Sequence, residues 1–158
     1  MLNLAPEKLG ELVKADAAFL DRMFDAAEIR DVGPPRCDML FIYADLTPEG
    51  RVVGSTMGLR EIVRDSGAKI VVIASENSPE SYIKAGAIQP YGRANLVMTL
   101  DRCSDSFECF LSALFSRMKS GTSMPDAWVQ LSPQVPEGVS GGNPVMIFAC
   151  EIGAVSFA

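Results

Sequence analysis

The chain has 158 residues, a length typical of one domain that buries about two-thirds of its unfolded surface without disulfides or metals. Hydrophobic residues make up 48% of it and charged residues 22%, which disfavours wholesale disorder. The net charge of −6 and the scattered Lys and Arg residues argue against nucleic acid and anionic membranes as partners.

Cysteine and histidine usage narrows the chemistry further. The four cysteines form no C-x-x-C pair, and the chain contains no histidine. This pattern fits reduced thiols in a cytoplasmic protein better than a zinc site. The opening segment MLNLAPEKLGE lacks the features of a signal peptide, and no apolar run approaches the roughly 18 residues of a membrane span. We therefore expect a cytoplasmic domain with no cofactor and no membrane contact.

The first part of the chain is predicted to be helical. Apolar residues recur at helical spacing from Pro6 to about Ile29, and Asp16 is a polar interruption of that stripe. The segment DVGPPRC, residues 31–37, follows with two consecutive prolines, which fix φ and end a helix. The sequence therefore predicts a helix over 6–29 and a linker over 31–37.

From residue 38 onward, strand-like and helix-like segments alternate. Apolar runs of strand length occupy 38–45, 68–75, 94–100 and 144–153. Segments with helical periodicity lie at 55–67, 78–87, 105–120 and 125–131. Strands that are apolar on both faces and alternate with helices predict a mostly parallel sheet covered on both sides. We expect a single three-layer α/β/α domain over 1–158, with its α/β core at 38–153.

Polar residues follow the predicted strands. In open α/β sheets, ligands bind beyond the carboxyl ends of the strands. The residues placed there, which we call the candidate cleft, are Asp45, Ser75, Glu76 and Asp101, with Arg102 and Cys103 next along the chain. Strands also end in polar residues simply because the chain reaches water, so a merely solvated edge remains an alternative.

The absence of histidine limits what this cleft can do. Ser–His and Cys–His couples are impossible, because nucleophilic catalysis of that kind needs imidazole as the base. Asp45 and Asp101 offer carboxylate ligands for a divalent cation such as Mg²⁺. Cys103 precedes a predicted helix and has Arg102 beside it, two features that lower a thiol pKa. An unreactive thiol and a coincidental pair of aspartates are the simpler interpretations.

Three stretches of the chain carry a family resemblance: GLREIVRDSGAKIVVIASEN, the segment from ANLVMTLDRC to MPDAWVQL, and NPVMIFACEIG. Together they resemble CHAT domains, caspase-like modules of the clan that includes caspases and separase, over roughly 38–153. In active members a histidine follows the strand at 38–45 and a cysteine follows the next strand. Here Asp45 lies about where the histidine belongs, and Ser75 replaces the cysteine. The resemblance implies a degenerate module without its His/Cys dyad.

A second resemblance is to receiver domains, which are flavodoxin-like. CDMLFIYADLTPEG looks like the third strand of a receiver with its terminal aspartate, and SYIKAGA looks like the stretch after the fourth strand. A receiver also needs an acidic pair after an N-terminal strand and a lysine after the fifth strand. Asp101 stands where that lysine would fall. This resemblance implies a pseudo-receiver signalling domain that is catalytically empty.

Both resemblances favour a non-enzymatic interaction or scaffold module. We expect it to bind a protein partner or to self-associate through the face around the candidate cleft. The alternatives are a small-molecule enzyme or metal-binding domain that uses Asp45 and Asp101 or Cys103, and a subunit that functions only within an oligomer.

Overall fold

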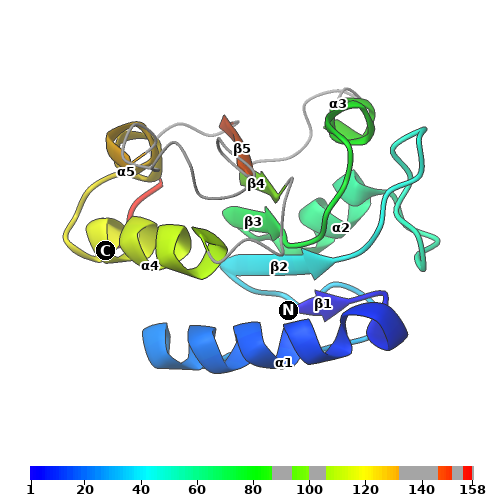
Figure 1. Cartoon of the computed structure of the whole chain (residues 1–158), viewed down its shortest axis with the longest axis horizontal. Helices are drawn as coiled ribbons and strands as arrows, with labels where there is room; N and C mark the ends of the chain where they lie inside the picture. Colours follow the sequence, from blue (N-terminus) through cyan, green and yellow to red (C-terminus); the bar gives the residue numbers. More distant parts are fainter. Residues whose placement is uncertain (87–93, 100–105, 132–145, 151–154, 158) are drawn as a thin grey trace.

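Figure 1 shows the computed structural model of the chain, a central sheet with helices on both sides. The structure describes residues 1–86, 94–99, 106–131, 146–150 and 155–157. Among these residues the strands are β1 (Leu2–Asn3), β2 (Met39–Tyr43), β3 (Ile70–Ile73), β4 (Asn95–Thr99) and β5 (Met146–Cys150). The helices are α1 (Pro6–Met23), α2 (Leu59–Ser66), α3 (Pro79–Gly86), α4 (Ser106–Lys119) and α5 (Met124–Leu131).

The strands lie in the order β1-β2-β3-β4-β5. Strands β1 to β4 are parallel, and β5 is antiparallel to β4. The side chains of β3 are buried on both faces, and those of β2 are buried from Leu40 onward, as expected for parallel strands between two helical layers. The predicted three-layer α/β/α fold with a mostly parallel sheet is confirmed.

One residue extends the sheet beyond β1. Arg30 forms an isolated parallel bridge with Leu2; its N–H donates to Met1 O at 2.9 Å, and its carbonyl oxygen accepts the Asn3 N–H at 2.8 Å. When Arg30 is counted as a strand, the parallel segments lie in chain order 2-1-3-4-5, which is a doubly wound order. The segment 31–37 contains no helix and makes the short connection from Arg30 to β2.

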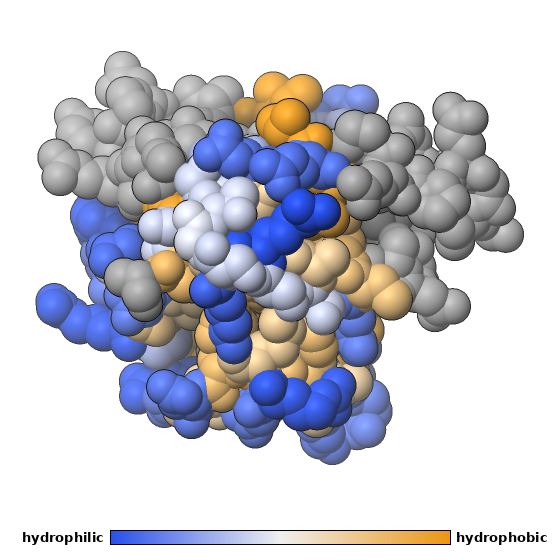
Figure 2. Space-filling view, turned by 90° about the vertical axis from the view of Figure 1, so that its left-hand side faces the viewer, coloured by the Kyte–Doolittle hydropathy of each residue, from blue (hydrophilic) through white to orange (hydrophobic). Residues whose placement is uncertain are grey.

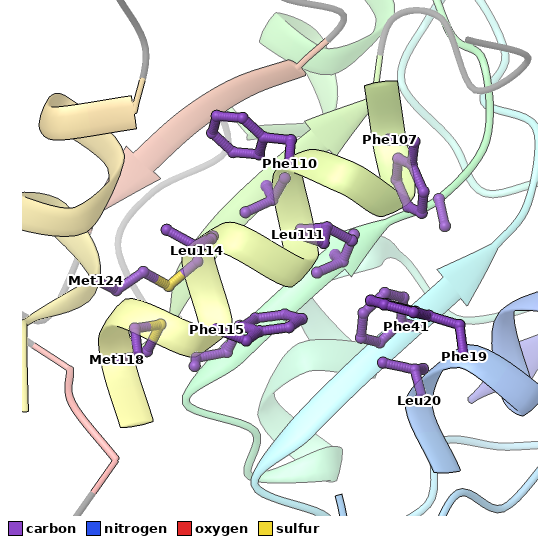
Figure 3. Packing of buried hydrophobic residues seen from close by; sticks show 14 of the residues in the cluster. Phe19, Leu20, Phe41, Phe107, Phe110, Leu111, Leu114, Phe115, Met118 and Met124 are labelled. Atoms are coloured by element: carbon purple, nitrogen blue, oxygen red, sulfur yellow. The ribbon is translucent and has the colours of Figure 1, made fainter. Parts of the chain in front are cut away.

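The two faces of the sheet carry separate apolar clusters. Helices α1, α4 and α5 cover one face, and α2 and α3 cover the other. Figure 3 shows α1 and α4 side chains meeting over β2 on the first face. The apolar residues that give the segment 105–120 its helical periodicity are buried there: Phe107, Phe110, Leu111, Leu114, Phe115 and Met118. Burying each such side chain contributes about 1.5–3 kcal/mol.

Helix α1 ends at Met23, so the prediction that it extends to about Ile29 is wrong. Phe24 is extended, and its ring packs edge-on against Phe115 at 5.4 Å and against Phe157 at 5.6 Å between ring centroids. The chain then turns back to place Arg30 beside Leu2. These contacts outweigh the helical periodicity, because they connect α1 to the core and to the sheet edge.

Candidate functional site

Three members of the candidate cleft belong to the described residues: Asp45, Ser75 and Glu76. Asp101, Arg102 and Cys103 lie outside them, as does the possible Asp45–Asp101 cation site. Glu76 is exposed at the end of β3. The arrangement at the carboxyl edge can therefore be built from the residues that follow β2 and β3.

Ser75 has a structural role at this edge. The residue is 1% exposed, and its Oγ accepts the backbone N–H of Ala44 at 2.8 Å. Just before it, Ala74 N–H donates to Ile42 O at 2.8 Å. The serine hydroxyl thus takes the place of a carbonyl and continues the β2–β3 pairing past the last strand residues. A buried oxygen engaged in this way is not presented to a substrate.

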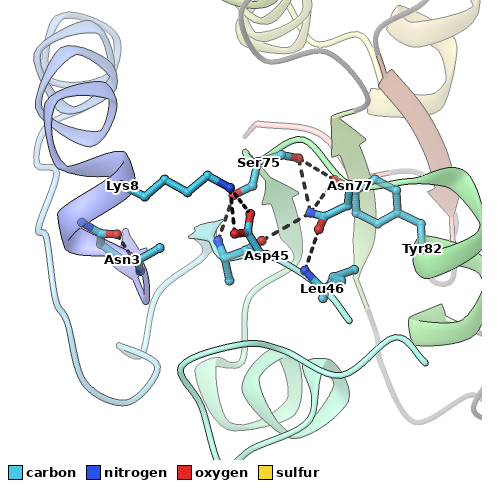
Figure 4. A network of polar contacts seen from close by, with 9 residues as sticks. Asn3, Lys8, Asp45, Leu46, Ser75, Asn77 and Tyr82 are labelled. Atoms are coloured by element: carbon cyan, nitrogen blue, oxygen red, sulfur yellow. Dashed lines mark hydrogen bonds and ion pairs between the residues drawn. The ribbon is translucent and has the colours of Figure 1, made fainter. Parts of the chain in front are cut away.

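Asn77 continues this connection, and the sequence reasoning missed it. Its Oδ1 accepts the Leu46 N–H at 2.6 Å, and its Nδ2 donates to Ala44 O at 3.3 Å. Figure 4 shows the amide lying between the two chain segments that leave β2 and β3. Asn side chains commonly bind backbone groups in turns, so the available signal was an asparagine in the turn between Ser75 and the start of α3.

Tyr82 closes the network from α3. The residue is 2% exposed, and its hydroxyl contacts Ser75 O and Thr99 O, each at 2.7 Å. One phenolic proton is shared between these two carbonyls, which joins the ends of β3 and β4. Burial raises the pKa of Tyr82 far above its ordinary range. The phenol therefore stays protonated near neutral pH and acts as a hydrogen-bond donor rather than as a base.

Asp45 is paired with Lys8 from the first turn of α1. Lys8 Nζ lies 2.8 Å from Asp45 Oδ1 and 2.7 Å from Oδ2, and the Asp45 side chain is 36% exposed (Figure 4). The pair spans the carboxyl ends of β1 and β2, where the doubly wound order reverses and where such folds bind their ligands. The chain's own ammonium and carboxylate groups thus occupy that position.

The turn after β2 closes the same region further. Gly54 has φ +80°, and a Cβ atom there would lie 2.5 Å from Leu4 O at the end of β1. The backbone around residue 54 therefore rests directly on the end of β1. Main chain thus covers the end of β1 at this point.

A buried carboxylate, that of Asp16, lies between α1 and the sheet. Asp16 is fully buried, and its Oδ2 accepts the Tyr43 hydroxyl at 2.8 Å. This bond explains the polar interruption of the α1 stripe, because a buried carboxylate needs hydrogen-bond donors. The pairing was not predicted, since Tyr43 is 27 residues away in the sequence.

Metal and thiol chemistry has few candidates in the described part of the chain. No group of three His, Cys, Asp or Glu side chains there is arranged to hold a metal ion. Cys37 is half-buried, and burial raises the pKa of its thiol above the usual value. Cys109 is exposed on α4.

Two adjoining hollows lie at the opposite, amino-terminal edge of the sheet. Their volumes are about 440 and 630 Å³, and both are lined by Phe24, Asp25, Asp38 and Met39. We call them together the amino-edge groove. Figure 2 faces this end of the molecule and shows apolar side chains lying between charged ones. The sequence did not indicate this groove, because its walls come from segments far apart in the chain.

No protein-family model, curated protein or solved structure matches this chain. Within the described residues, no helix combines the length and the apolar character needed to cross a bilayer.

Proposed function

We propose that this chain is a non-enzymatic interaction or scaffold module. The observation that carries the proposal is the buried Ser75 hydroxyl, which accepts the Ala44 N–H. The CHAT-like resemblance puts the nucleophile at this position, and a nucleophile needs both access to substrate and a base within reach. The position has instead become part of the connection between β2 and β3.

The contacts across the ends of β1 and β2 support the same proposal. A ligand entering there would have to displace Lys8 from Asp45 and separate the turn at Gly54 from Leu4. The doubly wound strand order is common to many folds with unrelated functions, so it supports an α/β scaffold and no particular reaction. A degenerate CHAT-like module is the form of this domain that we propose, and a pseudo-receiver signalling domain is the alternative.

Peptide hydrolysis by the purified protein tests this proposal. We expect no hydrolysis that depends on Ser75 or Cys103, so wild type, Ser75→Ala and Cys103→Ala should give the same background rate. Ser75→Ala should instead lower the free energy of unfolding by about 1–3 kcal/mol, because the Ala44 N–H loses its acceptor. Ser116→Ala, on the exposed side of α4, is the control and should change stability by less than about 0.5 kcal/mol.

Two results would contradict the proposal. One is peptide cleavage that disappears in Ser75→Ala or Cys103→Ala while the protein stays folded. The other is a melting temperature that rises with Mg²⁺ or Mn²⁺ in the wild type and not in Asp45→Ala, because a metal that binds only the native state must stabilise it. The second result would favour the metal-dependent alternative.

A further inference from the structure

The amino-edge groove has an apolar floor, and core residues beneath the floor pack against it. Phe24 forms part of that floor and packs edge-on against Phe115 and Phe157. Lys119 lies over the Phe24 ring at 4.9 Å from its centroid and donates to Met23 O. The end of α1 and the end of α4 are therefore fastened together. A surface ordered in advance loses less conformational entropy when it binds.

The charged side chains around the groove are balanced in sign. Its lining contains three acidic residues, Asp25, Glu28 and Asp38, and three basic residues, Arg36, Lys69 and Lys119. The whole chain has 20 acidic and 14 basic residues. Contact between two copies is opposed by their like net charge, and this opposition is weakest where the local surface is neutral.

The charges are also separated across the sheet. Asp25 and Glu28 follow α1, and Arg36 and Asp38 precede β2, so this side carries three acidic residues and one basic residue. Lys69 precedes β3 and Lys119 ends α4, so the other side carries two basic residues. The side chains of Asp25 and Lys69 make no hydrogen bond or ion pair among the described residues. Both residues are exposed, so their charges can meet a partner.

We propose that the partner of this module is a second copy of the same chain, bound through the amino-edge groove. A two-fold axis at the groove places the acidic side of one protomer on the basic side of the other, and the two apolar floors meet between them. Two-fold dimers use the same patch on both subunits, so the patch must complement itself. A groove with one side of net negative charge and one side of net positive charge meets this condition. The inference rests on the proposed interaction function and gives it a partner.

Charge exchange tests the contact by sedimentation equilibrium of the full chain, with a reductant present because Cys109 is exposed. Wild type should dimerise. Asp25→Lys and Lys69→Glu should each weaken dimerisation about ten-fold or more. A two-fold dimer contains the contact between residues 25 and 69 two times, and each variant puts like charges opposite one another at both contacts. An equimolar mixture of the two variants should dimerise like the wild type, since both charge pairs are restored between unlike protomers. Glu11→Lys, on the outer side of α1, is the matched control and should leave the dimer unchanged.

Three outcomes would overturn the inference: a wild type that stays monomeric at all accessible concentrations, single variants that dimerise as tightly as wild type, or a mixture that fails to recover. Circular dichroism of each variant shows whether it is folded, so loss of the dimer is not confused with unfolding. None of these outcomes bears on the absence of Ser75-dependent hydrolysis. Failure of the dimer and failure of the non-enzymatic proposal are therefore distinguishable.

Discussion

Tyr82 connects the ends of two strands through one hydroxyl. Its proton is shared between Ser75 O and Thr99 O, and the ring is buried under α3. Tyr82→Phe keeps the ring and removes the donor, so both carbonyls lose a partner. We expect the free energy of unfolding at pH 7 to fall by about 1–3 kcal/mol, measured by urea denaturation.

The pH dependence of this difference follows from the raised pKa of Tyr82. An unfolded tyrosine ionises near its ordinary pKa of 10.0, whereas the folded residue keeps its proton well above that pH. Above pH 10 the native state binds more protons than the unfolded state, so wild-type stability falls by about 1.4 kcal/mol per pH unit from this residue. The gap between wild type and Tyr82→Phe should therefore narrow between pH 10 and 11. A constant gap would show that Tyr82 ionises equally in both states.

Two polar residues of β4 are buried on the face covered by α4. Among the described residues, the amide of Asn95 and the Oγ1 of Thr99 have no hydrogen-bond partner. An unpaired buried hydroxyl lowers stability by about 1–3 kcal/mol. Thr99→Val keeps the shape and removes that hydroxyl, while the Thr99 carbonyl still accepts from Tyr82.

Thermal denaturation of Thr99→Val should show an increase in stability of about 1–2 kcal/mol. Thr99→Ser is the matched variant, because it keeps the hydroxyl and loses the methyl group, and it should be less stable than wild type. If Thr99→Val is less stable than Thr99→Ser, the hydroxyl has a favourable role in the core.

The candidate site could be predicted from the sequence only in part. The order of strands and helices correctly placed Asp45 and Ser75 at the carboxyl edge. Whether each side chain faces solvent or the chain itself depends on partners such as Lys8 and Asn77, which are distant in sequence or have no periodic signal. Asp16 could be recognised as unusual, but its partner could not be identified.

At the scale of elements, the turn between β2 and α2 depends on two close approaches. Gly50 has φ +80°, and a Cβ there would lie 2.4 Å from the backbone nitrogen of Ala85 on α3. Gly54 makes the similar approach to β1. These contacts hold the turn against elements on both sides of β2, and only glycine permits them.

Gly50→Ala should lower the free energy of unfolding by about 2–4 kcal/mol, because it adds steric overlap to the strain of a positive φ. Gly33→Ala is the control: Gly33 also has a positive φ of +67°, but no atom lies within 4 Å of its missing Cβ. We expect about 1 kcal/mol of strain for that variant. Equal losses in the two variants, measured by urea denaturation, would show that the contact with Ala85 is unimportant.

Element types were predictable here, whereas element ends were less so. All four predicted strands are present. The two whose predicted ranges are described throughout are shorter than predicted: 39–43 in place of 38–45, and 70–73 in place of 68–75. The apolar run includes residues such as Ala44 and Ala74, which are buried although they lie beyond the assigned strands. Burial thus extends beyond the strand in this sheet. Strand β1 has only two residues, too few for any periodicity.

At the scale of the molecule, the doubly wound order depends on a single residue. Arg30 is the single residue that pairs with the outer side of β1, and no helix lies between it and β2 in the sequence. The central strands β2 and β3 are paired on both sides and covered by both helical layers. Stability should therefore fall steeply from the centre of the sheet toward the β1 edge.

Native-state hydrogen exchange can measure this gradient. The amides of Phe41 and Val72 should exchange only through global unfolding, because their neighbours on both faces are buried. The Asn3 amide, bonded to Arg30 O at 2.8 Å, should open at a free energy several kcal/mol lower, since only one bridge fastens that edge. An Asn3 amide that exchanges as slowly as Val72 would show that the edge and the centre unfold together. Arg30 would then belong to the cooperative core.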